Sequence, residues 1–203
     1  MHPPLPDDPR GPVAPGLEEL LALATPMDTC RGMFFTGLLE AARALGGEEV
    51  RGQCFLAMGQ KKFVDFFSYP VADFLRAVFV TCAQLGPMLG GQEAVMRQLG
   101  RRGTTDFLQS TVGKTMLALA GSDPHRLLAT IPSACRAALS YGERSVKQLG
   151  EHQARLSARR DFLPMAYNEG LITAALEQST ARDISVRGKR LGLLDVDYEA
   201  SWS

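Results

Sequence analysis

Apolar residues recur at helical spacing through the first two thirds of this 203-residue chain. The clearest stripe consists of Val71, Phe74, Leu75, Val78, Phe79 and Cys82. Residues three and four positions apart share one face of a helix, so these stripes predict amphipathic helices. We expect helices over residues 17–24, 32–45, 48–58, 70–86, 92–110, 112–120 and 124–130, with a further helical segment from residue 131 to about 139.

Glycine and proline residues set most of the expected helix boundaries. The expected breaks lie at Gly46-Gly47, at Gly86-Pro87 and at Ile131-Pro132-Ser133. Asp123 is expected to cap the helix that starts with Pro124, because an aspartate before a proline at the first helical position is a common start signal. Asp28 or Thr29 is expected to cap the helix that follows them.

After residue 142 the period of the apolar residues changes to two, which is the spacing of β-strands. Ala154, Leu156 and Ala158 alternate with polar residues, and the hairpin that contains them is expected to turn near residues 150–151. Helical spacing returns over residues 164–179. A second hairpin is predicted from residues 184–187 and 191–202, with its turn at Gly188-Lys189. One face of its second arm carries Leu194, Val196, Tyr198, Ala200 and Trp202.

These elements predict an α+β fold in which an N-terminal multi-helix bundle packs on a C-terminal four-stranded antiparallel sheet of ββαββ order. Residues 16–203 are expected to form one domain, with a helical part at 16–142 and the ββαββ part at 143–203. Five prolines within the first 14 residues, followed by Pro15, predict a disordered or polyproline-like tail over residues 1–15.

Composition excludes several classes of protein. The 22 basic and 22 acidic residues give a net charge of zero, which argues against a dedicated nucleic-acid binder. No stretch is long and apolar enough to span a membrane, and the first ten residues lack the apolar segment of a signal peptide. The four cysteines lie far apart, so we expect free thiols in a reducing cytoplasm.

A candidate anion-binding face lies on the first predicted hairpin. Arg155, Ser157 and Arg159 alternate along one strand, so their side chains point the same way and can together hold a phosphate or carboxylate. Residues 97–160 carry 11 basic and four acidic side chains, so the neutral total leaves room for such a face. The alternative is that these three residues form only the solvated side of the hairpin.

Other chemistry is weakly supported by the residue pattern. Gly113-Lys114-Thr115 resembles the end of a P-loop, but Leu108 stands where that motif needs its first glycine. Asp195, Asp197 and Glu199 line one face of the last strand, where they form either a cation site or a solubilising face. Histidines and cysteines form no metal-binding set and no nucleophilic triad is evident, so we expect neither a metal nor an enzyme.

Three segments carry a resemblance to known proteins. They are residues 31–35 (RGMFF), residues 98–109 with Leu99-Gly100 and Phe107-Leu108, and the terminal Asp197-Tyr198 followed by Trp202. Over residues 28–203 the chain resembles a large paralogous family of uncharacterised myxobacterial proteins. That family is similar to the haem-nitric-oxide/oxygen-binding fold, which vinyl-4-reductase-type ligand domains and the Bet-three-like subunits of vesicle-tethering complexes share.

The resemblance makes a specific expectation about haem. A haem domain of this type would need an axial histidine on the helix after the Phe-Leu-Gln segment, and residues 114–120 contain none. It would also need a Tyr-x-Ser-x-Arg clamp, and Arg155 replaces the tyrosine. We therefore expect no cofactor and interpret the chain as a non-enzymatic regulatory domain that contacts a protein partner or a second copy of itself. The alternative is a sensor that binds a small apolar or acidic ligand between helices and sheet.

Overall fold

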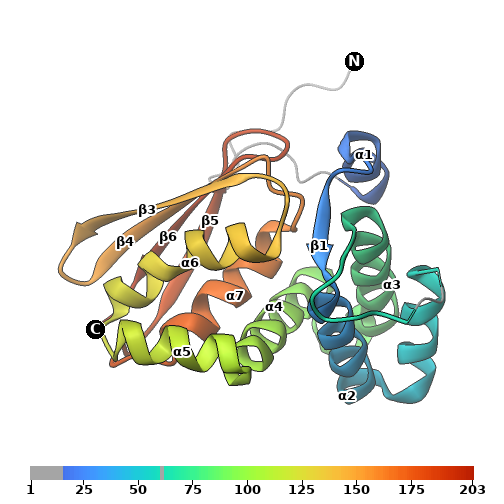
Figure 1. Cartoon of the computed structure of the whole chain (residues 1–203), viewed down its shortest axis with the longest axis horizontal. Coiled ribbons are helices and arrows are strands. Elements are labelled where there is room, and N and C mark those ends of the chain that lie inside the picture. Colours follow the sequence, from blue (N-terminus) through green and yellow to red (C-terminus); the bar gives the residue numbers. More distant parts are fainter. Residues whose placement is uncertain (1–15, 60–61) are drawn as a thin grey trace.

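The computed structural model describes residues 16–59 and 62–203, so the predicted tail lies outside the described residues. Figure 1 shows the arrangement of the elements. In chain order they are α1 (Leu17–Leu23), β1 (Thr29–Arg31), α2 (Gly32–Ala57), β2 (Ser68–Pro70), α3 (Val71–Leu89), α4 (Gln92–Gln109), α5 (Thr111–Ala120), α6 (Pro124–Ala138), β3 (Glu143–Gly150), β4 (Gln153–Arg159), α7 (Met165–Leu176), β5 (Ser185–Arg190) and β6 (Val196–Ser201).

The C-terminal sheet has the predicted ββαββ order. Its four strands are all antiparallel and lie in the spatial order β3-β4-β6-β5. Leu156 of β4 pairs with Tyr198 of β6, so the apolar residues of both strands face the same side. The α+β fold class predicted from the alternation of apolar residues is thereby confirmed. The two-stranded ribbon of β1 and β2 was not predicted, because three residues are too few to show a period.

Helices α6 and α7 cover the inner face of the sheet, and the N-terminal helices pack beyond them (Figure 1). Ala154, Leu156 and Ala158 on β4 are buried on this side, as the period-two pattern predicted. Helix α4 contacts α7 most closely. The carbonyl oxygen of Tyr167 would lie 1.9 Å from a Cβ atom at Gly100, so only glycine allows this approach.

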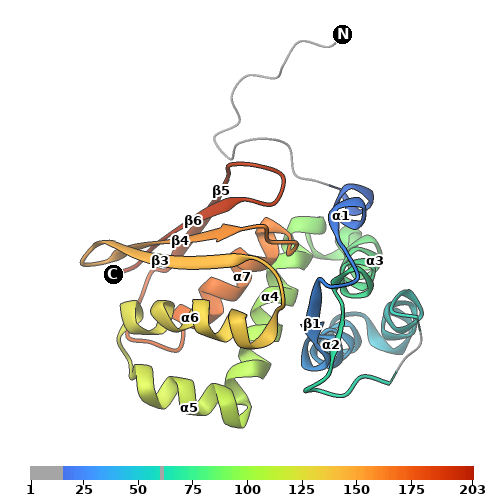
Figure 2. The same ribbon diagram turned by 45° about the horizontal axis from the view of Figure 1, so that its top comes forward.

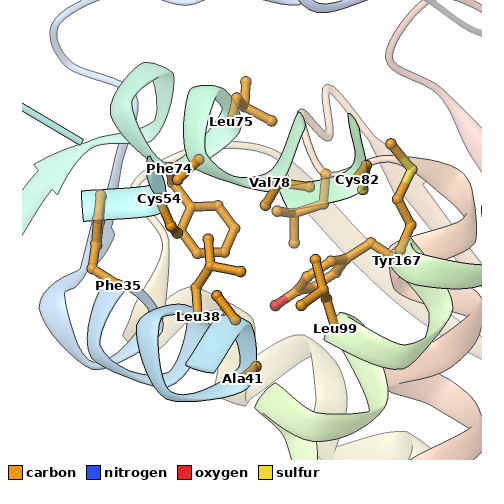
Figure 3. Close-up of a cluster of buried hydrophobic side chains, with 14 of the residues drawn as sticks. Phe35, Leu38, Ala41, Cys54, Phe74, Leu75, Val78, Cys82, Leu99 and Tyr167 are labelled. Atoms are coloured by element: carbon orange, nitrogen blue, oxygen red, sulfur yellow. The ribbon is translucent and has the colours of Figure 1, made fainter. Parts of the chain in front are cut away.

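The N-terminal helices enclose a core that extends onto α7 (Figure 3). Phe35 of α2 stacks on Phe63 with ring centroids 4.4 Å apart. Phe74 of α3 meets Tyr167 of α7 edge to face at 6.1 Å. Burial of these aromatic side chains is a main stabilising contribution, because each removes a large apolar area from water. The aromatic contacts therefore link the N-terminal helices to α7, while a second buried cluster that includes Leu156 and Tyr198 lies at the inner face of the sheet.

Two predicted boundary signals are confirmed, and a third is corrected. Gly47 has φ +77°, and the helical run of α2 is broken there. The Asp123 side chain accepts a hydrogen bond from the Arg126 N–H at 2.8 Å and caps α6. Asp28 does not cap α2. It binds Arg160 instead, with N···O distances of 2.6 and 2.9 Å, because β1 separates it from that helix.

The Asp28 contact links the N-terminal part to the end of β4. The hydrogen bonds from Arg160 lower the pKa of this buried carboxyl to about 2, although burial opposes the shift. A carboxylate held in this way stays ionised throughout the neutral range. Residues far apart in sequence are therefore joined by a charge-assisted contact that no sequence pattern indicated.

Three further boundaries differ from the prediction. Helix α3 continues through Pro87 and α6 continues through Pro132, so each proline removes one hydrogen bond without ending its helix. The second C-terminal hairpin turns over residues 191–195 and not at Gly188-Lys189. Gly188 lies inside β5, where a Cβ atom would meet the Met165 side chain at 2.5 Å. This glycine marks a close approach to α7, which sequence alone does not distinguish from a turn.

Within the described residues, no single helix is both long and apolar enough to cross a membrane. Helices α3 and α4 meet the length and hydropathy requirement only as a pair, and the chain bends by 113° between them.

Candidate functional site

An apolar cleft lies between helices α2, α4, α5, α6 and α7. It consists of three adjoining pockets of about 80, 370 and 610 Å³, and Phe107 near the end of α4 lines all three. The innermost pocket is lined mainly by Phe34, Met116, Ile131, Cys135, Tyr167 and Leu171. The sequence predicts the ligand cleft between the helices and the sheet. This prediction is wrong, because α6 and α7 cover the inner face of the sheet and the cleft is formed by helices.

Helix α5 leaves the outer part of this cleft open. Its sequence is apolar apart from Lys114 and two threonines, yet its buried residues are only Gly113 and Ala120. Val112 is 53% exposed and Leu119 is 79% exposed. In Figure 2 the helix lies at the edge of the molecule, beyond α6 and away from the sheet. An apolar helix with so little burial presents a surface that favours contact with another apolar group.

The polar groups in the inner cleft are neutral. Burial raises the pKa of the Cys135 thiol to about 11, so this thiol stays protonated near pH 7. Burial also raises the pKa of the Tyr167 hydroxyl far above the neutral range. A protonated, partly buried thiol is a poor nucleophile and a poor metal ligand. The inner cleft therefore suits an apolar group better than a charged one.

The predicted anion-binding residues are brought together, but on the opposite face of the sheet from the helices. Arg155 Nη2 lies 2.6 Å from Glu199 Oε1, and Arg159 Nη2 lies 2.8 Å from Asp197 Oδ1. Hydrogen bonds from Arg159 and Ser157 lower the pKa of Asp197, although burial opposes this shift. The basic residues of β4 and the acidic residues of β6, which were predicted as separate faces, thus form one surface. On this surface Arg155 and Arg159 each have a carboxylate partner. Anion binding at Arg155, Ser157 and Arg159 stays a prediction.

We expect Arg155→Ala and Arg159→Ala to lower the melting temperature only slightly. Their side chains are 39% and 41% exposed, and ion pairs in contact with water contribute little to stability. Thermal unfolding followed by circular dichroism measures this effect. Arg187→Ala on β5 of the same sheet is a suitable control, since Arg187 is also exposed. A large fall at position 155 or 159 alone would contradict the placement of these residues on a solvated face.

None of the described residues that line the cleft is a histidine, the residue that holds the haem iron in globins and peroxidases. Other groups that can bind a haem iron are present, namely the sulfur atoms of Met33, Met116 and Cys135 and the hydroxyl of Tyr167. His125 packs on Trp202, with ring centroids 4.8 Å apart, and His152 lies on the hairpin turn between β3 and β4. The cleft lies on the side of the sheet that α6 and α7 cover, whereas Arg155, Ser157 and Arg159 lie on the opposite face. These three residues therefore cannot hold the carboxylates of a group bound in the cleft. The described residues of the cleft therefore do not fit a haem that is held by an axial histidine and a Tyr-x-Ser-x-Arg clamp.

Comparison with known proteins supports the fold. A family model described as a protein of unknown function (DUF2378) matches residues 23–203, which is most of the chain. The chain belongs to the DUF2378 family. No curated protein matches this DUF2378 sequence. Among the described residues of the DUF2378 chain, no three histidine, cysteine or acidic side chains lie close enough to hold a metal ion.

Solved structures similar to the DUF2378 chain are H-NOX proteins. The Fe(II) unliganded H-NOX protein from K. algicida is 12% identical, with a TM-score of 0.67 over 85% of this chain and 96% of its own. The Fe(II)NO form of an H-NOX protein from S. oneidensis is 14% identical, with a TM-score of 0.67 over 85% and 99%. An oxygen-binding H-NOX domain related to soluble guanylate cyclases is 13% identical, with a TM-score of 0.65 over 85% and 95%. At these identities the match shows a shared fold, as the resemblance predicted.

Proposed function

We propose that this DUF2378 chain is a haem-free, non-enzymatic regulatory domain that binds a small apolar ligand in the cleft around Phe107. The H-NOX fold is a ligand-sensing fold, and the observation that carries the proposal is the cleft itself. Its inner walls are apolar, the ionisable groups of its innermost pocket are neutral, and its outer part lies beside the exposed side of α5. A ligand that covers Val112 and Leu119 would remove apolar surface from water, which favours binding.

The proposal assigns no catalytic role to the cleft. Cys135 is the thiol that lines it, and its pKa near 11 keeps it protonated. The absence of a histidine from the lining also supports a ligand other than haem. The second candidate is a domain that only contacts a protein partner, and the exposed apolar residues of α5 are compatible with that as well. A test of whether a small ligand binds inside the cleft distinguishes these two candidate functions.

A cleft-filling substitution tests the proposal. Ala134 of α6 lines both the innermost pocket and the largest one, so Ala134→Phe places a ring inside the cleft. We expect the protein to bind the neutral fluorescent probe N-phenyl-1-naphthylamine and Ala134→Phe to weaken this binding at least tenfold, measured by fluorescence titration. A neutral probe avoids attraction to arginines elsewhere.

Ala83→Phe on α3 is the matched control, because Ala83 is exposed and lies outside the cleft. It should bind the probe like the parent protein. Equal binding by Ala134→Phe, or no binding by the parent, would leave the protein-contact function as the better proposal. Mixing the purified protein with hemin and then desalting should leave no absorption band at about 400 nm. A retained band would contradict the haem-free assignment.

A further inference from the structure

A second pocket, of about 280 Å³, lies apart from the cleft and shares none of its lining residues. It lies between α1, α3, the first turns of α4 and α7, and the ends of β5 and β6 that face them. Most of its wall is apolar and comes from Leu20, Phe79, Met96, Phe162, Leu163 and Val196. Its size is near the lower end of small-molecule sites, which span roughly 300–1,000 Å³.

One charged side chain in this pocket is buried and has no direct partner in the part of the chain that the structure describes. Arg190 at the end of β5 is only 6% exposed and lines the pocket. In β5, Gly188 and Arg190 face inward while Arg187 and Lys189 face the solvent. Across residues 16–59 and 62–203, no hydrogen bond or ion pair joins the Arg190 guanidinium to another side chain or to a carbonyl group. A guanidinium is rarely buried in this way unless an anion neutralises it.

The two carboxylates of the pocket wall are already bound to other arginines. Asp161 contacts Arg144 at 2.8 Å, and Glu93 contacts Arg97 at 3.1 Å. Glu93 acts on Arg190 through space without a hydrogen bond, and burial still lowers the pKa of Arg190. Neither carboxylate therefore binds the Arg190 guanidinium directly, and a group from outside the described residues can do so.

Two helices begin at the same pocket. Gln92 and Glu93 belong to the first turn of α4, and Met165 and Ala166 belong to the first turn of α7. Neither helix has a side-chain cap. The N–H groups of a first helical turn have no partner within the helix and carry a partial positive charge, which favours an anion. Arg190 and the N-terminal ends of α4 and α7 therefore both favour an anion in this pocket.

We propose that this pocket binds the carboxylate or phosphate group of a small, partly apolar molecule, with Arg190 as its charged contact. The planar guanidinium can donate two parallel hydrogen bonds to either oxyanion. The apolar wall formed by Leu20, Phe79 and Met96 would hold the remainder of the molecule. This site is separate from the cleft, so it does not depend on the function proposed above.

Isothermal titration calorimetry on the full chain tests the site with sodium benzoate and sodium phosphate, each compared with sodium chloride at equal ionic strength. We expect the parent protein to bind at least one of them beyond the chloride effect. Arg190→Met keeps the apolar stem and removes the charge, and it should weaken binding at least tenfold. Arg187→Met removes an exposed arginine from the same strand and should bind like the parent. Preference for benzoate or for phosphate identifies the oxyanion.

A second measurement separates an anion site from a structural arginine. In a HEPES–chloride buffer, Arg190→Met should be at least as stable to heat as the parent, because it removes a buried charge that has no direct partner. Addition of the bound anion should raise the melting temperature of the parent and of Arg187→Met, but not of Arg190→Met. The proposal is overturned if the parent binds neither anion, or if Arg190→Met binds like the parent. It is also overturned if Arg190→Met is much less stable than Arg187→Met without added anion.

Discussion

Gly100→Ala is expected to destabilise the protein by about 3 kcal/mol or more, which is the upper range for overpacking in a protein core. The added Cβ atom would lie 1.9 Å from the carbonyl oxygen of Tyr167, and a backbone atom cannot move away by changing a rotamer. Gly170 on α7 makes the reciprocal contact, since its Cβ would lie 2.0 Å from the carbonyl oxygen of Arg97. Both helices would have to separate. Urea unfolding followed by circular dichroism measures the loss.

Gly52→Ala on α2 is the matched control for this substitution. Nothing lies within 4 Å of a Cβ atom at Gly52, so alanine should stabilise the helix there by roughly 0.5–1 kcal/mol. Because Gly103 and Phe107 on α4 and Tyr167 on α7 line the cleft, Gly100→Ala should also weaken binding of the neutral probe. A cost below about 1 kcal/mol would show that α4 and α7 are not packed this closely.

Asp161→Asn is expected to cost about 3–5 kcal/mol, because it leaves a buried arginine without its counter-charge. The Arg144 and Asp161 side chains are only 4% and 2% exposed, and they lie 2.8 Å apart. The Asp161 carboxylate also accepts hydrogen bonds from the Leu163 N–H at 3.1 Å and the Asn168 amide at 3.2 Å. These contacts hold the segment between β4 and α7. Chemical denaturation at neutral pH gives the change in the free energy of unfolding.

Two further variants distinguish loss of the ion pair from general damage. Replacing both partners, as Arg144→Met with Asp161→Leu, should recover much of the stability, since a buried ion pair can be replaced by apolar residues at little cost. Asp106→Asn breaks the exposed pair with Arg102 and should cost less than about 1 kcal/mol. If Asp161→Asn lowered the stability as little as Asp106→Asn, the ion pair between Arg144 and Asp161 would have to be exposed to water.

Much of the architecture follows from local patterns. The ββαββ order and the inward-facing Ala154, Leu156 and Ala158 were predictable, because a strand buried on one face needs apolar residues at every second position. The caps and breaks at Asp123 and Gly47 were predictable for a similar reason, since they depend on a few neighbouring residues. Pro87 and Pro132 were misjudged because tertiary packing can maintain a helix through a proline.

The candidate sites were less accessible to sequence reasoning. Arg155, Ser157 and Arg159 were correctly placed on one face, but their partners Asp197 and Glu199 come from another strand and depend on register. Arg190 was missed because the hairpin turn was placed at Gly188-Lys189. Extending the period of two through β5 would have put Arg190 on the inner face beside Gly188, and a basic residue at an inward position is the signal that was available.

The amino-acid sequence by itself determined the fold class and the ββαββ order of the C-terminal part, because apolar spacing and turn residues act over a few neighbouring positions. It also indicated the family resemblance and the lack of a histidine on the helix where a haem domain would need one. Only the tertiary structure decided that α5 leaves an apolar cleft open, that the Arg155 face is neutralised by β6, and that Arg190 is buried with no direct partner among the described residues. Those three properties depend on contacts between residues far apart in the chain, which no local pattern specifies.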